Sequence, residues 1–300
     1  MTGWRMNGWQ EIAFFALMGL VFGSFLNVTR VRMPAGESIV YPGSHCVRCG
    51  AMLRWWQNIP VVSWLLLRGR CHACGVGISA IYPLMEVATA ALWAGCAAVA
   101  GGEVAQAVAM AVFCWMMLLL AALDGEQLWL PDRVTWPAIG LGLLWQGMSA
   151  WMQPHEPSFL RMEVLAGLGL HGSGRWQVWA GAVLMAAMAA IAGAGMVLVI
   201  RLAYWAVRRR EGMGLGDAKL MATLGAWLGW TAMMDAFFVA VLAATLAALV
   251  WLAVMRWKKS GEEWKTMPLP LGTFLALAAM GEIFRPAWLW VAWMRVGARF

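Results

Sequence analysis

Long apolar stretches dominate this chain and restrict it to folds that a lipid bilayer can hold. Runs of about 20 residues match the length at which an α-helix crosses a hydrocarbon core of about 30 Å. We predict about eight such helices, at residues 12–29, 84–100, 104–123, 134–152, 177–200, 218–234, 236–255 and 268–284. A further apolar run, at 286–294, is too short to be counted as a span.

The composition supports a helical membrane protein over the other fold classes. With 62% hydrophobic and 12% charged residues, the chain has too little polar surface for a water-soluble domain. The two-residue alternation of an outer-membrane barrel is absent, so helices are favoured. The sequence therefore predicts an all-α polytopic membrane protein.

A cleaved export signal is an alternative interpretation of the first apolar run, because this run follows Arg5. It leads straight into a charged loop, however, through Gly23-Ser24-Phe25-Leu26-Asn27-Val28, with no clear small-x-small cleavage site. We therefore expect residues 1–29 to form the first transmembrane helix.

Basic residues indicate the orientation. The loop 30–82 carries six arginines against the single acid Glu37, so the positive-inside rule places it in the cytoplasm. If each predicted span crosses the membrane once, the cytoplasmic side also receives the segments 124–133, 201–217 and 256–267. The last two of these segments are also basic. The net charge of +7 is thus a topology signal and an expected contact with anionic lipid, and it does not indicate nucleic-acid binding. We expect residues 83–300 to form the transmembrane core.

Two carboxylates share the predicted cytoplasmic face. Asp217 follows the glycine-rich stretch Gly212-Met213-Gly214-Leu215-Gly216 at the start of an apolar span, where desolvation makes a charge costly. This topology brings Asp124, at the end of the third span, to the same side and depth. Carboxylates that approach closely share one proton, which is the condition under which aspartic proteases activate water.

A simpler interpretation of these acids stays open on the residues alone. Asp124 and Asp132 would then be solvated loop acids, and Asp217 would be a helix N-cap after a glycine turn. The topology permits a catalytic pair and does not require one.

Four cysteines in the loop 30–82 form two Cys-x-x-Cys pairs, Cys46-Val47-Arg48-Cys49 and Cys71-His72-Ala73-Cys74. Two such pairs typically supply four thiolates to one tetrahedral zinc ion, and four thiolates leave no open position, which indicates a structural role. A reducing cytoplasm argues against two stable disulfides. A redox role is the alternative. We expect His45 and His72 to lie beside the site, and Cys96 and Cys114 to be packed apolar residues.

Several motifs, in their order along the chain, resemble those of the bacterial type IV prepilin peptidase family, the bifunctional leader peptidase and N-methyltransferase of pilus and type II secretion systems. They are Gly23 to Val28, the two cysteine pairs, Asn58 to Leu65, Arg68-Gly69-Arg70-Cys71, Ile78 to Glu86, Asp124 to Asp132, Glu211 to Leu220 and Gly225 to Trp230.

The resemblance implies that Asp124 and Asp217 are the catalytic pair, with Asp132 a neighbour. It implies a prepilin or pseudopilin substrate whose short basic leader is cut after glycine on the cytoplasmic side of the bacterial inner membrane. It also implies N-methylation of the new N-terminus from S-adenosylmethionine. The chain contains no glycine-rich strand-turn-helix nucleotide site, and we assign no residue to methyl transfer.

The chain departs from the family pattern at Val47, at Ala80 and in Leu269-Pro270-Leu271-Gly272-Thr273-Phe274-Leu275. We expect these departures to affect the zinc loop and the last helix more than the aspartates, and methylation more than proteolysis. Two other functions remain alternatives: a zinc-bearing membrane scaffold for pilus or secretion assembly, and a membrane thiol oxidoreductase.

Overall fold

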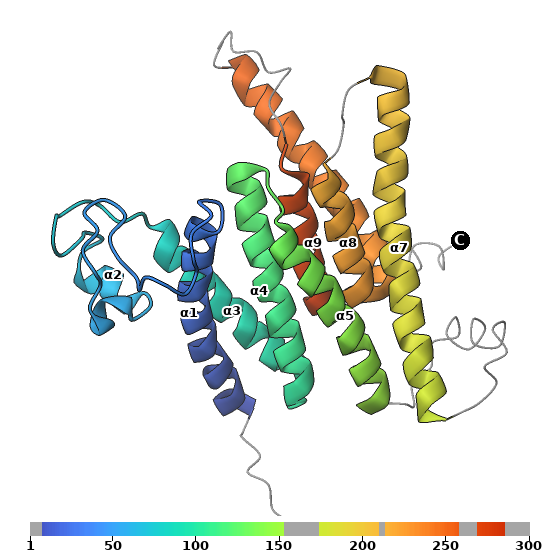
Figure 1. The fold of residues 1–300 in the computed structure, drawn as a ribbon, viewed down its shortest axis with the longest axis horizontal. Helices are drawn as coiled ribbons and strands as arrows, with labels where there is room; N and C mark the ends of the chain where they lie inside the picture. The colour runs from blue at the N-terminus through green and yellow to red at the C-terminus, as the bar shows by residue number, and fades with distance from the viewer. Residues whose placement is uncertain (1–7, 153–173, 210–213, 258–268, 286–300) are drawn as a thin grey trace, which may run out of the picture. The chain divides into compact units, whose positions relative to one another are not determined.

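The structure, a computed structural model, describes residues 8–152, 174–209, 214–257 and 269–285. The described residues form helices joined by loops, and one loop contains two isolated β-bridges. Gly212, Met213 and the apolar run 286–294 lie outside the described residues. Contacts between Cα atoms divide the chain into two compact units, Met1–Leu119 and Leu120–Phe300, whose helices are labelled in Figure 1.

The first unit is built on the pairing of two long helices. It contains α1 (Gly8–Arg32), the 3-10 helix η1 (Trp55–Asn58), α2 (Val62–Leu66), α3 (Ile81–Ala100) and most of α4 (Val104–Gln127). α1 packs along α3, where the rings of Phe22 and Trp93 lie 4.7 Å apart. The Sγ atoms of Cys96 and Cys114 lie 3.8 Å apart, and both side chains are buried, as expected of packed apolar residues.

The second unit is organised around one long helix. It contains the end of α4, α5 (Asp132–Met152), α7 (Arg175–Arg208), α8 (Leu215–Trp257) and α9 (Leu271–Phe284). α8 packs against α5, α7 and α9. The Trp227 indole of α8 donates to the carbonyl of Ala138 (2.7 Å), while the Trp227 carbonyl accepts from Gln146 (2.7 Å). These two bonds fasten α8 to α5.

The described part of the chain has five helices long and apolar enough to cross a membrane, fewer than the eight predicted. They are Gly8–Arg32, Ile81–Ala100, Val104–Gln127, Arg175–Arg208 and Leu215–Val254. The predicted spans at 218–234 and 236–255 belong to α8, whose helical geometry is interrupted at Gly229 and not near residue 235. α5 mixes polar residues among its apolar ones, and α9 has only 14 residues. Both helices form where spans were predicted, but neither meets the length and hydropathy of a span.

Candidate active site and metal centre

Asp124 lies in the last turn of α4, with 6% of its surface exposed. Its Oδ2 accepts a hydrogen bond from the backbone N–H of Thr273 (2.6 Å) and lies 3.1 Å from the Thr273 hydroxyl. Thr273 is the third residue of α9, where backbone N–H groups have no partner inside the helix. The carboxylate therefore caps a helix distant in sequence and complements the positive end of its dipole.

Two contacts place Leu130, a buried residue of the loop between α4 and α5, beside both aspartate-bearing segments. A Cβ atom on Gly272 would lie 2.9 Å from Cγ of Asp124 and 3.0 Å from Cδ1 of Leu130. A Cβ atom on Gly216 would lie 3.0 Å from Cβ of the same leucine. A side chain at Gly272 would force Asp124 to move, and one at Gly216 would crowd Leu130, so Leu130 lies against the backbone near each carboxylate.

Asp217 lies in the first turn of α8 and is partly exposed. Its Oδ2 accepts a hydrogen bond of 3.3 Å from the N–H of Gly214, the residue before the helix. Asp217 is therefore the third residue of α8 and not its N-cap, and it reaches back to the cap as in half of a capping box. The charge of Asp124 acts on this carboxylate. The two aspartates that the sequence singled out thus lie on segments that pack against the same leucine.

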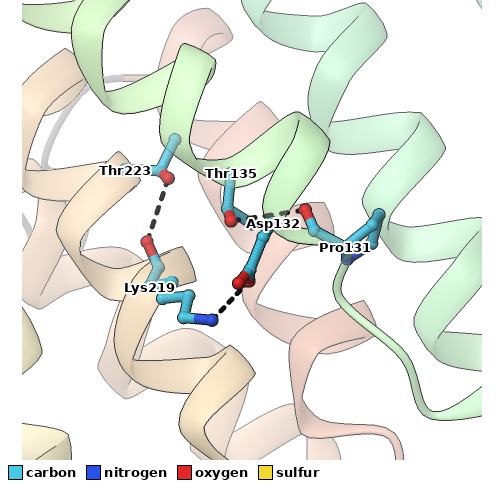
Figure 2. A network of polar contacts seen from close by, with 5 residues as sticks. All are labelled: Pro131, Asp132, Thr135, Lys219 and Thr223. Atoms are coloured by element: carbon cyan, nitrogen blue, oxygen red, sulfur yellow. Dashed lines mark hydrogen bonds and ion pairs between the residues drawn. The ribbon is translucent and has the colours of Figure 1, made fainter.

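A polar network joins the starts of α5 and α8 (Figure 2). The ammonium group of Lys219 pairs with the Asp132 carboxylate, and Thr223 donates to the Lys219 carbonyl (3.0 Å). Because 59% of the Asp132 side chain is exposed, water screens the pair and its contribution to stability is small. The pair shows that the helix turn that carries Asp217 lies beside the start of α5.

Thr273 and Leu130 are site residues that the sequence analysis missed. The expectation that the departing segment 269–275 affects the last helix more than the aspartates is wrong, because Thr273 donates to Asp124 directly. The physical reason for the contact is that α9 begins after Pro270 with no side-chain cap of its own, so its exposed N–H groups need an acceptor from elsewhere.

The four loop cysteines lie on two turns of the same design. In the first turn, Cys46 N–H donates to Ala51 and Gly50 N–H donates back to Cys46 (2.9 and 2.8 Å). In the second, Cys71 N–H donates to Val76 and Gly75 N–H donates back to Cys71 (2.8 and 2.9 Å). Gly50 and Gly75 both have φ of 71°, which explains why glycine follows each pair.

The cysteine cluster has the geometry of a metal site. Its four Sγ atoms lie within 4.8 Å of one another, and those of Cys46 and Cys74 are 3.9 Å apart. Zinc–sulfur bonds of about 2.3 Å in a tetrahedron separate the sulfurs by about 3.8 Å, so the cluster fits one such ion. N–H groups of Cys49 and Arg48 lower the pKa of the Cys46 thiol to about 6, and N–H groups of Cys74 and Ala73 lower the pKa of Cys71. Each turn therefore favours the thiolate of its first cysteine. The N–H of Val76 lowers the pKa of Cys74, but desolvation and the three neighbouring cysteines outweigh it and raise that pKa to about 11.

The two loop histidines lie beside this cluster and outside the set of four. Nδ1 of His45 lies 3.1 Å from the carbonyl of Gly43 and 3.3 Å from the Arg32 guanidinium. The His72 ring makes an edge contact with Trp56. Four thiolates alone complete a tetrahedral set.

Comparison with known proteins identifies the family. Residues 17–100 match the Bacterial Peptidase A24 N-terminal domain, and residues 111–252 match the Type IV leader peptidase family. A prepilin leader peptidase/N-methyltransferase of Burkholderia pseudomallei (strain 1026b) is 34% identical over 92% of this chain and 85% of its own length. The chain belongs to the type IV leader peptidase family.

Other relatives extend the match over nearly the whole chain. The prepilin leader peptidase/N-methyltransferase of Pseudomonas putida is 31% identical over 98% of this chain and 95% of its own length. That of Klebsiella pneumoniae is 34% identical over 77% of this chain and 91% of its own length. No solved structure matches the chain. Both aspartates of this family member lie within the second matched region, and the four cysteines lie within the first.

Proposed function

We propose that this protein is an aspartic endopeptidase of the bacterial inner membrane that removes the basic leader of type IV prepilins or pseudopilins after glycine, on the cytoplasmic side. The observation that carries this proposal is that Leu130 packs beside the segments of both Asp124 and Asp217, which are far apart in the chain. The family match supports the substrate class, because relatives are prepilin leader peptidases.

The two carboxylates divide the work of peptide hydrolysis. One is ionised and takes a proton from a water molecule as the water oxygen attacks the scissile carbonyl carbon. The other is protonated, donates a hydrogen bond to the carbonyl oxygen, and helps to protonate the leaving amine when the C–N bond breaks. The bonds from Thr273 hold Oδ2 of Asp124, which leaves Oδ1 for the reacting water.

Each of three segments of the chain has its own proposed role. We propose that residues 1–29 form the first transmembrane helix, that residues 30–82 form a cytoplasmic loop and that residues 83–300 form the peptidase core. Cys46, Cys49, Cys71 and Cys74 would hold one structural zinc ion, which cross-links the two turns of a loop with little apolar core. A second activity, N-methylation of the new N-terminus, would use S-adenosylmethionine as the source of the methyl group.

The peptidase proposal is tested by isosteric replacement of each aspartate. Asp124→Asn and Asp217→Asn should each abolish cleavage of a model prepilin by purified full-length protein, because an amide cannot exchange the proton. Glu126→Gln, an exposed carboxylate two residues beyond Asp124, is the matched control and should cleave at the rate of the unmodified protein. Full cleavage by either Asn variant, at normal membrane levels, would contradict the proposal.

A further inference from the structure

The first unit contains an open cavity of about 570 Å³, lined by residues of α1, α2, α3 and the cysteine turns. Cavities of about 300–1,000 Å³ are the size that binds small organic ligands. Its wall includes Ser24, Asn27 and Glu86, from the motifs at 23–28 and 78–86, to which the aspartate chemistry gives no role. The cavity lies wholly within the first unit, whereas both aspartates belong to the second.

One end of the cavity carries buried acceptors. Asn27 is 3% exposed, and its Nδ2 donates to the carbonyl of Tyr82 (2.9 Å), while its Oδ1 has no hydrogen-bond partner among the described residues. Leaving a buried acceptor unpaired costs about 1–3 kcal/mol, so such an atom marks a position where a donor belongs. Glu86 is 8% exposed, and its Oε2 accepts from the N–H of Val61 (2.6 Å).

Close packing of α1 on α3 holds these acceptors in place. A Cβ atom on Gly23 would lie 2.6 Å from Cα of Glu86, so only glycine lets the helices approach this closely. Asn27 follows Gly23 by about one helical turn and therefore lies on the same face of α1. The glycine thus fixes both acceptors at the end of the cavity where the two helices meet.

The rest of the cavity selects against the basic leader. Much of the remaining wall is apolar, with Val28, Val31, Leu67, Val76, Ile78 and the Trp64 ring. Apart from Glu86, the one carboxylate among the lining residues of the described chain is the exposed Glu37. The lining also includes Arg32 and Arg54, which repel a run of lysine and arginine. A compact ligand fits better if it has an apolar body, one cationic, donor-rich end for Glu86 and a carboxylate for the arginines.

We propose that this cavity binds S-adenosylmethionine, with Asn27 Oδ1 and Glu86 accepting hydrogen bonds from its amino groups. The ligand carries a sulfonium and an ammonium charge, which suit a buried carboxylate, and an adenosine body, which suits the apolar wall. This assignment rests on the proposed methyltransferase activity, and it adds the residues that hold the methyl donor.

The test is direct binding of radiolabelled S-adenosylmethionine to purified full-length protein in detergent, with no prepilin present. Glu86→Gln keeps the size and an acceptor oxygen but removes the charge, and Asn27→Leu removes the unpaired acceptor. Each should raise the Kd about tenfold or more, as expected when a charged or buried hydrogen bond is lost. Val31→Trp, which fills the cavity, should abolish binding.

Three controls separate binding from folding and from proteolysis. Glu103→Gln, an exposed carboxylate of the same unit outside the cavity, should keep the Kd of the unmodified protein. Asp124→Asn should bind the methyl donor normally while failing to cleave. Leader cleavage by the Glu86→Gln and Asn27→Leu variants should persist, and it reports that each variant is folded.

The remaining outcomes would contradict the cavity assignment or show that the peptidase proposal has failed instead. If the unmodified protein binds no S-adenosylmethionine, or if all three cavity variants bind it normally, the assignment is wrong. Unchanged methyl-donor affinity with a raised KM for prepilin would instead make the cavity a leader site. If the cavity variants lose binding but the unmodified protein cleaves no prepilin, the peptidase proposal fails and the cavity assignment stands.

Discussion

Thr273 gives Asp124 a fixed orientation that the aspartate alone would not have. Its backbone N–H and its hydroxyl both lie within hydrogen-bond distance of Oδ2. The hydroxyl oxygen also lies 3.0 Å from the carbonyl oxygen of Ala121, which is one turn before Asp124 in α4. The one hydroxyl proton can therefore be donated either to the Asp124 carboxylate or to this carbonyl. The hydrogen bond from the Thr273 backbone N–H is present whichever acceptor the hydroxyl takes. The backbone N–H therefore sets the position of the Asp124 carboxylate, and the Thr273 hydroxyl makes a smaller contribution to its orientation.

Substitution of Thr273 separates these two contributions. Thr273→Val retains the shape and the backbone N–H but removes the hydroxyl, so we expect kcat for leader cleavage to fall about tenfold, as for loss of one hydrogen bond to a charged group. KM should change little, because the hydroxyl contacts the enzyme's own carboxylate. Thr273→Ser restores the donor and should recover most of the rate. Equal rates for the Val and Ser variants would show that the hydroxyl has no part in positioning Asp124.

The candidate site was predictable from the sequence only in part, for reasons that individual residues make clear. Asp124 and Asp217 stand out because a carboxylate at the end of an apolar run is costly and because charge topology places both on one side. Thr273 and Leu130 carry no such signal, since a threonine in a helix turn and a leucine in a loop are ordinary in any sequence. Their roles depend on contacts between distant segments.

At the scale of elements, Gly229 interrupts α8 with a backbone geometry that other residues avoid. Its φ of 73° and ψ of −177° lie in a region occupied almost only by glycine. The residues on either side of it are helical, so α8 changes direction there without a connecting loop. The glycine therefore allows a single 43-residue element to pack against α5, α7 and α9.

Replacement of Gly229 should destabilise the protein. Gly229→Ala forces a Cβ into this backbone region at a cost of about 1–3 kcal/mol, so we expect a lower apparent Tm for the detergent-purified protein. Gly281→Ala is the matched control, because open space surrounds this glycine of α9 and alanine favours helix. A Gly229→Ala variant that melts with or above the control would mean that α8 runs straight in solution.

Most helices were predictable because apolar runs of membrane length leave few alternatives. The predicted runs at 12–29, 84–100 and 104–123 lie within α1, α3 and α4. The error in α8 has a physical cause: the hydropathy of 218–255 is nearly continuous, and a single glycine sets the interruption by its φ angle. Hydropathy measures how apolar a segment is and carries no information on a backbone dihedral.

At the scale of the whole molecule, the cysteine cluster and the aspartates belong to different compact units. The first unit holds the two cysteine turns and the cavity, and the second unit holds Asp124, Asp217 and Thr273. The bonds that fix Asp124 come from α9, within its own unit. Loss of the metal should therefore affect the loop first.

Replacement of two of the proposed zinc ligands tests this independence. Cys46→Ser with Cys74→Ser should reduce bound zinc from about one ion per chain to none, because two thiolates do not complete a tetrahedral site. Limited proteolysis within residues 30–82 should become faster, while leader cleavage stays within about a factor of three of the unmodified rate, as expected of separately folded units. Cys96→Ala, a buried cysteine outside the cluster, should keep its zinc. Complete loss of cleavage together with the metal would contradict the independence of the units.

The bond between Thr273 and Asp124 also has a consequence for how the enzyme is made. Its partners are separated by 149 positions in the chain. A ribosome that has already synthesised both aspartates must still translate through residue 273 before the Asp124 carboxylate has its donors. The nascent chain therefore passes through a stage with both acids and an unfinished site, so we expect proteolytic activity only after residue 273 has been synthesised and has folded.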